Sequence, residues 1–109
     1  MPSTPAERLR IVVELASDHV RVHASGELDL ETGRGLEETL SEQRRDRDVL
    51  LDLREVGFVD SAGLRVLLGL RQHAARDGWW MTVVPSEPLR RLLTMTGTAG
   101  QFDLTDTPF

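Results

Sequence analysis

The sequence predicts a single α/β domain of 109 residues in which helices pack on a mixed β-sheet. Short apolar or alternating runs, typical of strands, are separated by longer runs with apolar residues at helical spacing. The first two strand-like runs follow each other directly, which indicates an antiparallel hairpin. The later ones are joined by helical runs, the crossovers that parallel strands require. We expect one domain over residues 1–109, with residues 1–7 flexible.

The amino-terminal half is predicted to contain the hairpin and one helix. Residues 9–15 and 20–24 alternate apolar and polar side chains on either side of a turn, as paired strands do. A helix is expected from about residue 29 to residue 45. Gly33 and Gly35 in its interior each cost about 1 kcal/mol relative to alanine, so we expect the start of this helix to fray.

The centre of the predicted domain is the run VLLDLREVGFVDSAGLRVLLGL, residues 49–70. Residues 49–53 are largely apolar, as in a strand buried on both faces of a sheet. Residues 54–57 are expected to break this strand, and residues 58–59 to turn inward. A helix then begins near Ser61. The order strand, loop, helix therefore places a serine at the start of a helix.

This second helix has an unusually wide apolar face, and the carboxyl-terminal elements follow it. Its apolar positions cover an arc of roughly 200°, about twice what packing on one core requires. Either a partner contacts the excess, or neighbouring helices cover both flanks. A strand over residues 79–84, a helix from Pro88 to Gly97 and an edge strand within residues 100–104 are expected next. The paired tryptophans 79–80 fit core and edge packing or, alternatively, binding.

The start of the helix at Ser61 has distinctive chemistry. Backbone N–H groups without partners and the positive end of the helix dipole favour an anion there, so a phosphate on Ser61 would be tolerated. Asp60 can cap the helix, and Gly63 removes a side chain that would crowd the hydroxyl. The alternative interpretation is plain capping, because aspartate and serine are common helix caps.

Two motifs resemble those of a known family. The run FVDSAGL at residues 58–64, preceded by LDL at residues 51–53, is similar to the signature of STAS domains. Within that family it resembles most the stand-alone bacterial anti-sigma factor antagonists. The run GELD at residues 26–29, followed by Thr32, is similar to a second family pattern. Asp29 can also be read as a simple helix cap, and the two roles are compatible.

The resemblance implies a regulatory function. In these antagonists the serine after the aspartate is phosphorylated by a partner kinase, and the matching residue is Ser61. The unphosphorylated form would bind an anti-sigma factor serine/threonine kinase and release a sigma factor, and a phosphatase would restore it. Position 62, often a second serine in the family, is alanine here. The implied partner-binding residues are Glu27, Asp29, Asp60, Ser61, Ala62, Gly63, Leu64 and Leu67.

Two other classes of function were considered. A STAS module can act without phosphorylation, as a scaffold or regulatory subunit of a stress-signalling or transporter complex. An enzyme with Ser61 as nucleophile is not expected, because a Gly-x-Ser-x-Gly elbow is absent: position 59 is valine. His73 would lie roughly 18 Å along the helix from Ser61, too far to activate it.

Composition excludes several kinds of site. This chain has no cysteine, which excludes disulfides and zinc–thiolate sites, and all 13 of its basic residues are arginine, which excludes a Walker A phosphate loop. The net charge of −5 argues against a nucleic-acid partner. We expect no cofactor and no metal, since His19 in the turn and His23 on a strand do not converge. Without a membrane-length apolar run or a signal peptide, a cytoplasmic location is predicted, with no membrane partner.

The resemblance fails at the carboxyl-terminal end. Antagonists of this kind usually continue into a further amphipathic helix, whereas this sequence stops at Phe109. We therefore expect the adjoining core surface to be covered in another way. Self-association is one answer, so a homodimer is a possible partner state.

Overall fold

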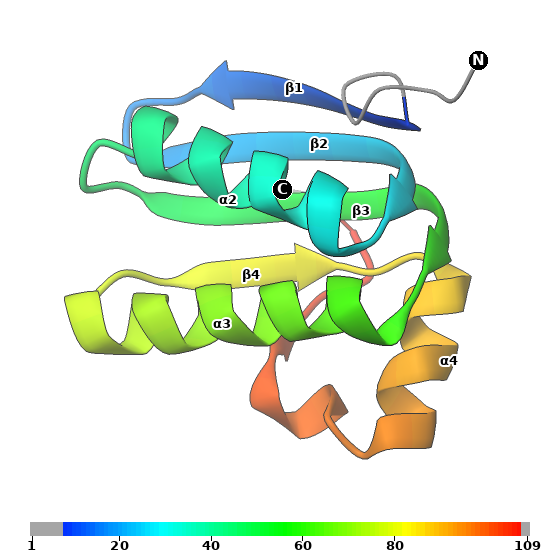
Figure 1. Ribbon diagram of the computed structural model, residues 1–109. Coiled ribbons are helices and arrows are strands. Elements are labelled where there is room, and N and C mark those ends of the chain that lie inside the picture. Colours follow the sequence, from blue (N-terminus) through cyan, green and yellow to red (C-terminus); the bar gives the residue numbers. More distant parts are fainter. Residues whose placement is uncertain (1–7, 108–109) are drawn as a thin grey trace.

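The computed structural model describes residues 8–107, so the flexibility expected of residues 1–7 lies outside the described residues. The described chain forms one five-stranded sheet, in the order β1-β2-β3-β4-β5, with helices packed on it (Figure 1). This confirms the predicted α/β class and the mixed sheet. The elements in chain order are β1 (Leu9–Leu15), β2 (His19–Leu28), α2 (Leu30–Gln43), β3 (Asp48–Val59), α3 (Ser61–Asp77), β4 (Met81–Val84), α4 (Glu87–Thr96), a 3-10 turn η1 (Ala99–Gln101) and β5 (Asp103–Leu104).

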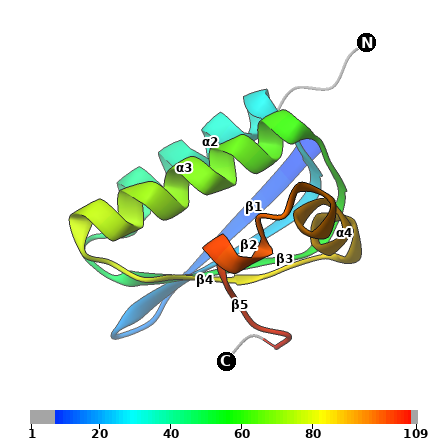
Figure 2. The same cartoon turned by 90° about the horizontal axis from the view of Figure 1, so that it is seen from below.

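Strand pairing follows the predicted split between a hairpin and parallel crossovers. β1 and β2 are antiparallel, with a register that runs from Leu9 opposite Gly26 to Leu15 opposite Val20. The pairs β2–β3, β3–β4 and β4–β5 are all parallel. α2 and α3 lie side by side on one face of the sheet (Figure 2). The connections after β2, β3 and β4 therefore all leave from the carboxyl ends of these parallel strands, and α2, α3 and α4 begin there (Figure 1).

The hydrophobic core lies between α2, α3 and the sheet face that they cover. The predicted buried strand is confirmed, because residues 49–53 of β3 are all buried. Fully buried side chains from the sheet and both helices meet in this layer, among them Val20, Val22, Leu36, Leu51, Leu53 and Leu67. Burial of each large aliphatic side chain contributes about 1.5–3 kcal/mol relative to leaving it exposed.

Two predictions about β3 were wrong. Residues 54–57 do not break the strand, because β2 extends to Leu28 and keeps pairing with it as far as Val59. Two register irregularities between β2 and β3 accommodate the extra length. Phe58 does not turn inward but is 49% exposed, whereas Val59 packs against the core as predicted.

A close approach of α2 to α3 explains the wide apolar face of α3. A Cβ atom on Gly33 of α2 would lie 2.9 Å from Cγ2 of Val66 on α3, so only glycine allows the two helices this distance. Val66 is thereby buried against α2, while Leu67 and Leu70 are buried in the core. The flank of α3 that carries Val66 is thus covered by a neighbouring helix. Within residues 8–107, every helix is too short or too polar to cross a lipid bilayer.

Candidate functional site

The candidate site lies where β2 and β3 end and where α2 and α3 begin (Figure 1). Leu28 pairs with Val59 at the ends of the two parallel strands, and the Asp60 N–H donates a hydrogen bond to the Leu28 carbonyl at 3.2 Å. Asp29 and Asp60 each follow the last residue of their strand. Pairing of β2 with β3 therefore brings the GELD and FVDSAGL motifs, which start 32 residues apart in the chain, together at the carboxyl ends of these strands.

At the start of α3, the cap and the candidate phosphate acceptor are different residues. Asp60 is the N-cap, and its Oδ1 accepts a hydrogen bond from the Gly63 N–H at 2.8 Å. Ser61 is the first residue of the helix and is exposed to solvent. Plain capping is therefore the role of Asp60. The hydroxyl of Ser61 remains accessible at the positive end of the helix dipole.

Gly63 has a packing role that the sequence did not indicate. A Cβ atom at this position would lie 2.3 Å from the carbonyl oxygen of Leu28 and 3.2 Å from the backbone nitrogen of Asp29. The absent side chain thus lets the first turn of α3 rest on the end of β2. The prediction that glycine keeps space open around the hydroxyl of Ser61 was wrong.

Three of the predicted partner-binding residues are buried and do not lie on the accessible surface of the site. Leu64 is only 4% exposed and Leu67 is fully buried, since both side chains point into the core. Gly63 is buried too, against the end of β2. Leu64 and Arg65 stand three and four positions after the exposed Ser61, on neighbouring parts of the helix surface, yet Arg65 is exposed and Leu64 is buried because it faces the core.

The other predicted residues lie on an accessible surface beside a groove between α2 and α3. Glu27 and Ser61 are exposed, and Asp29, Asp60 and Ala62 are half-buried. The groove, of about 260 Å³, is lined by Leu30, Arg34, Glu37, Ala62, Arg65, Val66 and Gly69. The sequence analysis did not identify the residues that line this groove. Their helical spacing was an available signal, because Arg34 stands four residues after Leu30 and Arg65 four residues after Ser61, and residues at this spacing share a helix face.

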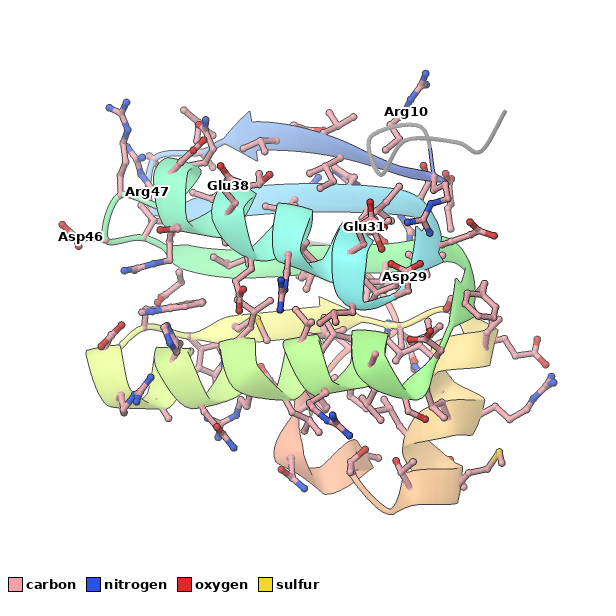
Figure 3. The ribbon with its side chains drawn as sticks, in the orientation of Figure 1. Arg10, Asp29, Glu31, Glu38, Asp46 and Arg47 are labelled. Carbon is pink, nitrogen blue, oxygen red and sulfur yellow. The ribbon has the colours of Figure 1, made fainter. Side chains whose placement is uncertain are left out.

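Asp29 caps α2 and lies next to a cationic side chain. Its Oδ1 accepts a hydrogen bond from the Thr32 N–H at 2.9 Å, and the Thr32 hydroxyl accepts one from the Asp29 N–H at 2.9 Å, a complete capping box. Arg8 also donates to the Asp29 carboxylate and reaches Glu31 at 3.4 Å. Asp29 and Glu31 both lie at the start of α2 (Figure 3). The Thr32 N–H and then the Arg8 guanidinium hold the pKa of Asp29 below its ordinary value.

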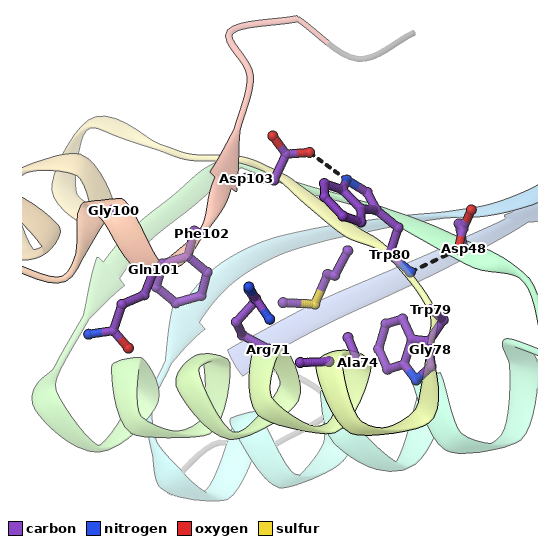
Figure 4. A pocket seen from close by; sticks show the side chains of 12 residues that line it. Asp48, Arg71, Ala74, Gly78, Trp79, Trp80, Gly100, Gln101, Phe102 and Asp103 are labelled. Carbon is purple, nitrogen blue, oxygen red and sulfur yellow. Dashed lines mark hydrogen bonds between the residues drawn. The ribbon is translucent and has the colours of Figure 1, made fainter.

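A second cavity lies toward the other end of α3. It has a volume of about 700 Å³, and Arg71, Trp79 and Phe102 are among the residues that line it (Figure 4). Trp80 is 62% exposed on its rim, yet its backbone N–H donates to Asp48 at 2.8 Å and its indole N–H to Asp103 at 2.7 Å. These two hydrogen bonds link the start of β4 to the starts of β3 and β5. Trp80 therefore has a packing role at this side of the sheet.

Residues 8–107 contain no group of three or more histidine, cysteine, aspartate or glutamate side chains positioned to hold a metal ion. The side chain of His23 instead lies between two carboxylates on the sheet face away from the helices. Its Nδ1 is 3.1 Å from Asp52 Oδ2, and its Nε2 is 3.2 Å from Glu14 Oε1. Burial raises the pKa of Asp52, but the Arg54 hydrogen bonds and charge outweigh it, and the net pKa is lowered.

The sheet order, the exposed serine after a capping aspartate and the adjacent GELD motif at the end of β2 agree with the STAS domain that the two motifs resemble. The family model described as "Mlab, STAS domain" matches residues 11–105, and the chain belongs to this family.

Among its relatives, the anti-sigma F factor antagonist of Paenibacillus polymyxa is 36% identical over 93 residues, 82% of this chain and 80% of that protein. The anti-sigma-B factor antagonist of Staphylococcus aureus is 35% identical over 79 residues, 70% of this chain and 73% of that protein. The crystal structure of an anti-sigma factor antagonist from Mycobacterium paratuberculosis superposes with a TM-score of 0.67 at 25% identity, covering 91% of this chain and 86% of the other.

Proposed function

We propose that this protein is an anti-sigma factor antagonist that is switched by phosphorylation of Ser61. In its unphosphorylated form it binds an anti-sigma factor with serine kinase activity, and this binding releases a sigma factor. The names of its relatives support the general function. The observation that carries the switch is the accessible Ser61 hydroxyl, which stands on the first turn of α3 while Asp60 supplies the cap.

The surface around Ser61 suits a protein partner. Leu30 is 48% exposed beside the groove, and Ala62 adds a small apolar contact. Arg34 and Arg65 on the walls supply positive charge and Glu37 supplies negative charge. Glu27 and Asp29 carry negative charge around Arg8. An apolar contact with charged groups around it is the usual composition of a protein interface. The partner-facing set thus consists of the exposed and half-buried residues, without Gly63, Leu64 and Leu67.

Phosphorylation would change this surface without unfolding the domain. A phosphate adds about −1.5 to −2 charges at neutral pH, and the start of α3 favours an anion. At the interface the same charge is added next to the carboxylates of Asp29 and Asp60, and it must be desolvated when the partner docks. Each 1.4 kcal/mol of that cost lowers the affinity about tenfold. Binding is lost while the fold persists.

A catalytic role for Ser61 is not supported by the geometry. His73 is exposed near the other end of α3, 12 residues from Ser61, which corresponds to roughly 18 Å along the helix. A general base must lie within about 3 Å of the hydroxyl that it activates. The named relatives are regulators of transcription factors, which agrees with a binding role.

The test is to isolate the kinase-like protein that co-purifies with this chain and to measure its affinity for four proteins. These are the wild type, Ser61→Ala, Ser61→Asp and the control Ser41→Asp, which adds the same charge at an exposed position of α2. We expect Ser61→Asp to lose at least about tenfold in affinity. Ser61→Ala and Ser41→Asp should bind like the wild type.

Incubation of the complex with ATP should add one phosphate, located on Ser61 by mass spectrometry, and none to Ser61→Ala. All proteins should give the circular dichroism spectrum of the wild type. Phosphate on another residue, or equal binding by Ser61→Asp and the wild type, would contradict the proposal.

A further inference from the structure

β1 forms one edge of the sheet, and residues 8–107 contain no strand that pairs with its outer side (Figure 1). The strand is seven residues long, whereas β5 at the opposite edge has only two. Two of its apolar side chains are exposed: Val12 at 48% and Leu15 at 58%. An open edge of this length is a template for pairing with another strand.

The charges of β1 are arranged symmetrically about its midpoint. Arg10, Val12 and Glu14 alternate with Ile11 and Val13, which pack against the core, so these three side chains share the face away from the helices. Arg10 and Glu14 stand two residues before and two residues after Val12. Across the hairpin, the register partner of Arg10 is the uncharged Ser25, so β2 offers this guanidinium no carboxylate directly opposite. Glu14, in contrast, lies opposite Arg21 and 3.2 Å from His23 Nε2.

We propose that a second copy of this chain pairs antiparallel with β1, with Val12 opposite Val12 of the partner subunit. This register places Arg10 opposite Glu14 of the partner subunit, and twofold symmetry forms the same pair again. On the helix-covered face, Leu15 lies opposite Leu9 of the partner subunit. The dimer then has one continuous sheet of ten strands, and both exposed apolar side chains of β1 acquire neighbours.

The charge pattern selects this arrangement over others. Parallel pairing in register would place Arg10 opposite its own copy, and like charges directly opposite are destabilising. Shifting the antiparallel register by two residues removes both Arg10–Glu14 pairs. Charged side chains often protect a sheet edge from pairing, and charges of a single sign would repel a second copy. β1 instead carries one charge of each sign on this face. A single strand edge buries less area than a standard interface, so we expect a weak, concentration-dependent dimer.

Sedimentation velocity over a concentration series tests the charge pairs. Arg10→Glu and Glu14→Arg should each raise the dimer dissociation constant about tenfold or more, because each turns two attractive pairs into two repulsive ones. The double variant R10E/E14R restores opposite charges and should return to within about threefold of the wild type. The exposed helix positions Arg76→Glu and Glu38→Arg are charge-matched controls that should dimerise normally.

Cysteine cross-linking tests the register directly, because the chain has no cysteine of its own. Val12→Cys should form a disulfide-linked dimer on mild oxidation. A mixture of Arg10→Cys and Glu14→Cys proteins should form the mixed dimer. Arg10→Cys alone should cross-link poorly, since the two copies of residue 10 lie about 13 Å apart along the strands, too far for a disulfide.

Each outcome either supports or contradicts the proposed dimer, and none depends on the proposed function. Rescue by the double variant together with cross-linking at position 12 supports the proposed dimer. A protein that stays monomeric up to millimolar concentration overturns it. A dimer that ignores both single charge reversals, or that cross-links equally through positions 10 and 12, also overturns it, because its interface then lies elsewhere.

Discussion

Two serines among residues 8–107 stand at the starts of helices, and the two helices use them in opposite ways. Ser86 is the N-cap of α4; it is only 4% exposed, and its hydroxyl accepts a hydrogen bond from the Leu89 N–H at 3.3 Å. Ser61 is one position further along its helix and is exposed, because Asp60 before it supplies the cap. A serine that caps a helix has its oxygen occupied, whereas a carboxylate cap leaves the next hydroxyl available.

The difference separates a structural serine from a candidate regulatory one. Both hydroxyls lie near the positive end of a helix dipole, so the dipole alone does not distinguish them. Burial and capping distinguish them. A kinase can reach only an exposed hydroxyl, whereas a capping hydroxyl is held in its hydrogen bond to the helix backbone. Substitutions at the two helix starts should therefore affect stability and regulation separately.

The largest effect should come from removing the close approach that positions Ser61. Gly63→Ala adds a Cβ atom 2.3 Å from the Leu28 carbonyl oxygen, a backbone atom that cannot rotate away. We expect a loss of about 2 kcal/mol or more in the free energy of unfolding, measured in urea. Gly69→Ala on the same helix meets no atom within 4 Å and should gain about 0.5–1 kcal/mol. Equal effects of both changes would refute the close contact.

A smaller effect is expected at the cap of α4. Ser86→Ala removes the acceptor of the Leu89 N–H and should cost about 1 kcal/mol of stability. Ser61→Ala removes a hydroxyl that does not cap its helix and should change stability by less than about 0.5 kcal/mol. Thermal unfolding of the two variants beside the wild type measures both values. If Ser61→Ala proved the more destabilising, the distinction between the two serines would fail.

The smallest effect concerns the start of α2 and depends on pH. Asp29→Asn keeps a side chain that can cap the helix but removes the charge that pairs with Arg8, so it should cost less than about 1 kcal/mol at neutral pH. The pKa of Asp29 in the folded protein lies below its ordinary value of 3.8, so the folded state holds this proton less tightly than the unfolded state does.

The stability contributed by the Asp29 charge is therefore present above about pH 4 and is lost as the pH falls through the folded-state pKa. Urea unfolding of the wild type and of Asp29→Asn at pH 7 and at pH 2–3 should show the gap between them closing at low pH. A gap that widened in acid would show that the assigned direction of the pKa shift is wrong.

The sequence by itself determined the order and type of the elements and the identity of the family. Alternation in the hairpin, the buried run at residues 49–53 and the helical spacing after Ser61 are local patterns, and each reports one backbone geometry. Capping is local as well, since it joins residues three positions apart; Asp29 with Thr32 is an example. The FVDSAGL and GELD motifs are contiguous, so their resemblance to the family could be read without a structure.

Only the tertiary structure decided which side chains reach the surface of the site. The continuation of β3 beyond residue 53 depends on β2 beside it, and the burial of Leu64 and Leu67 depends on how α3 lies on the sheet. The proximity of Arg8 to Asp29 and of Gly63 to Leu28 joins residues that are far apart in the chain. The periodicity of the sequence shows that a helix has an apolar side, but the elements that pack against the helix decide which residues at the boundary of that side are buried.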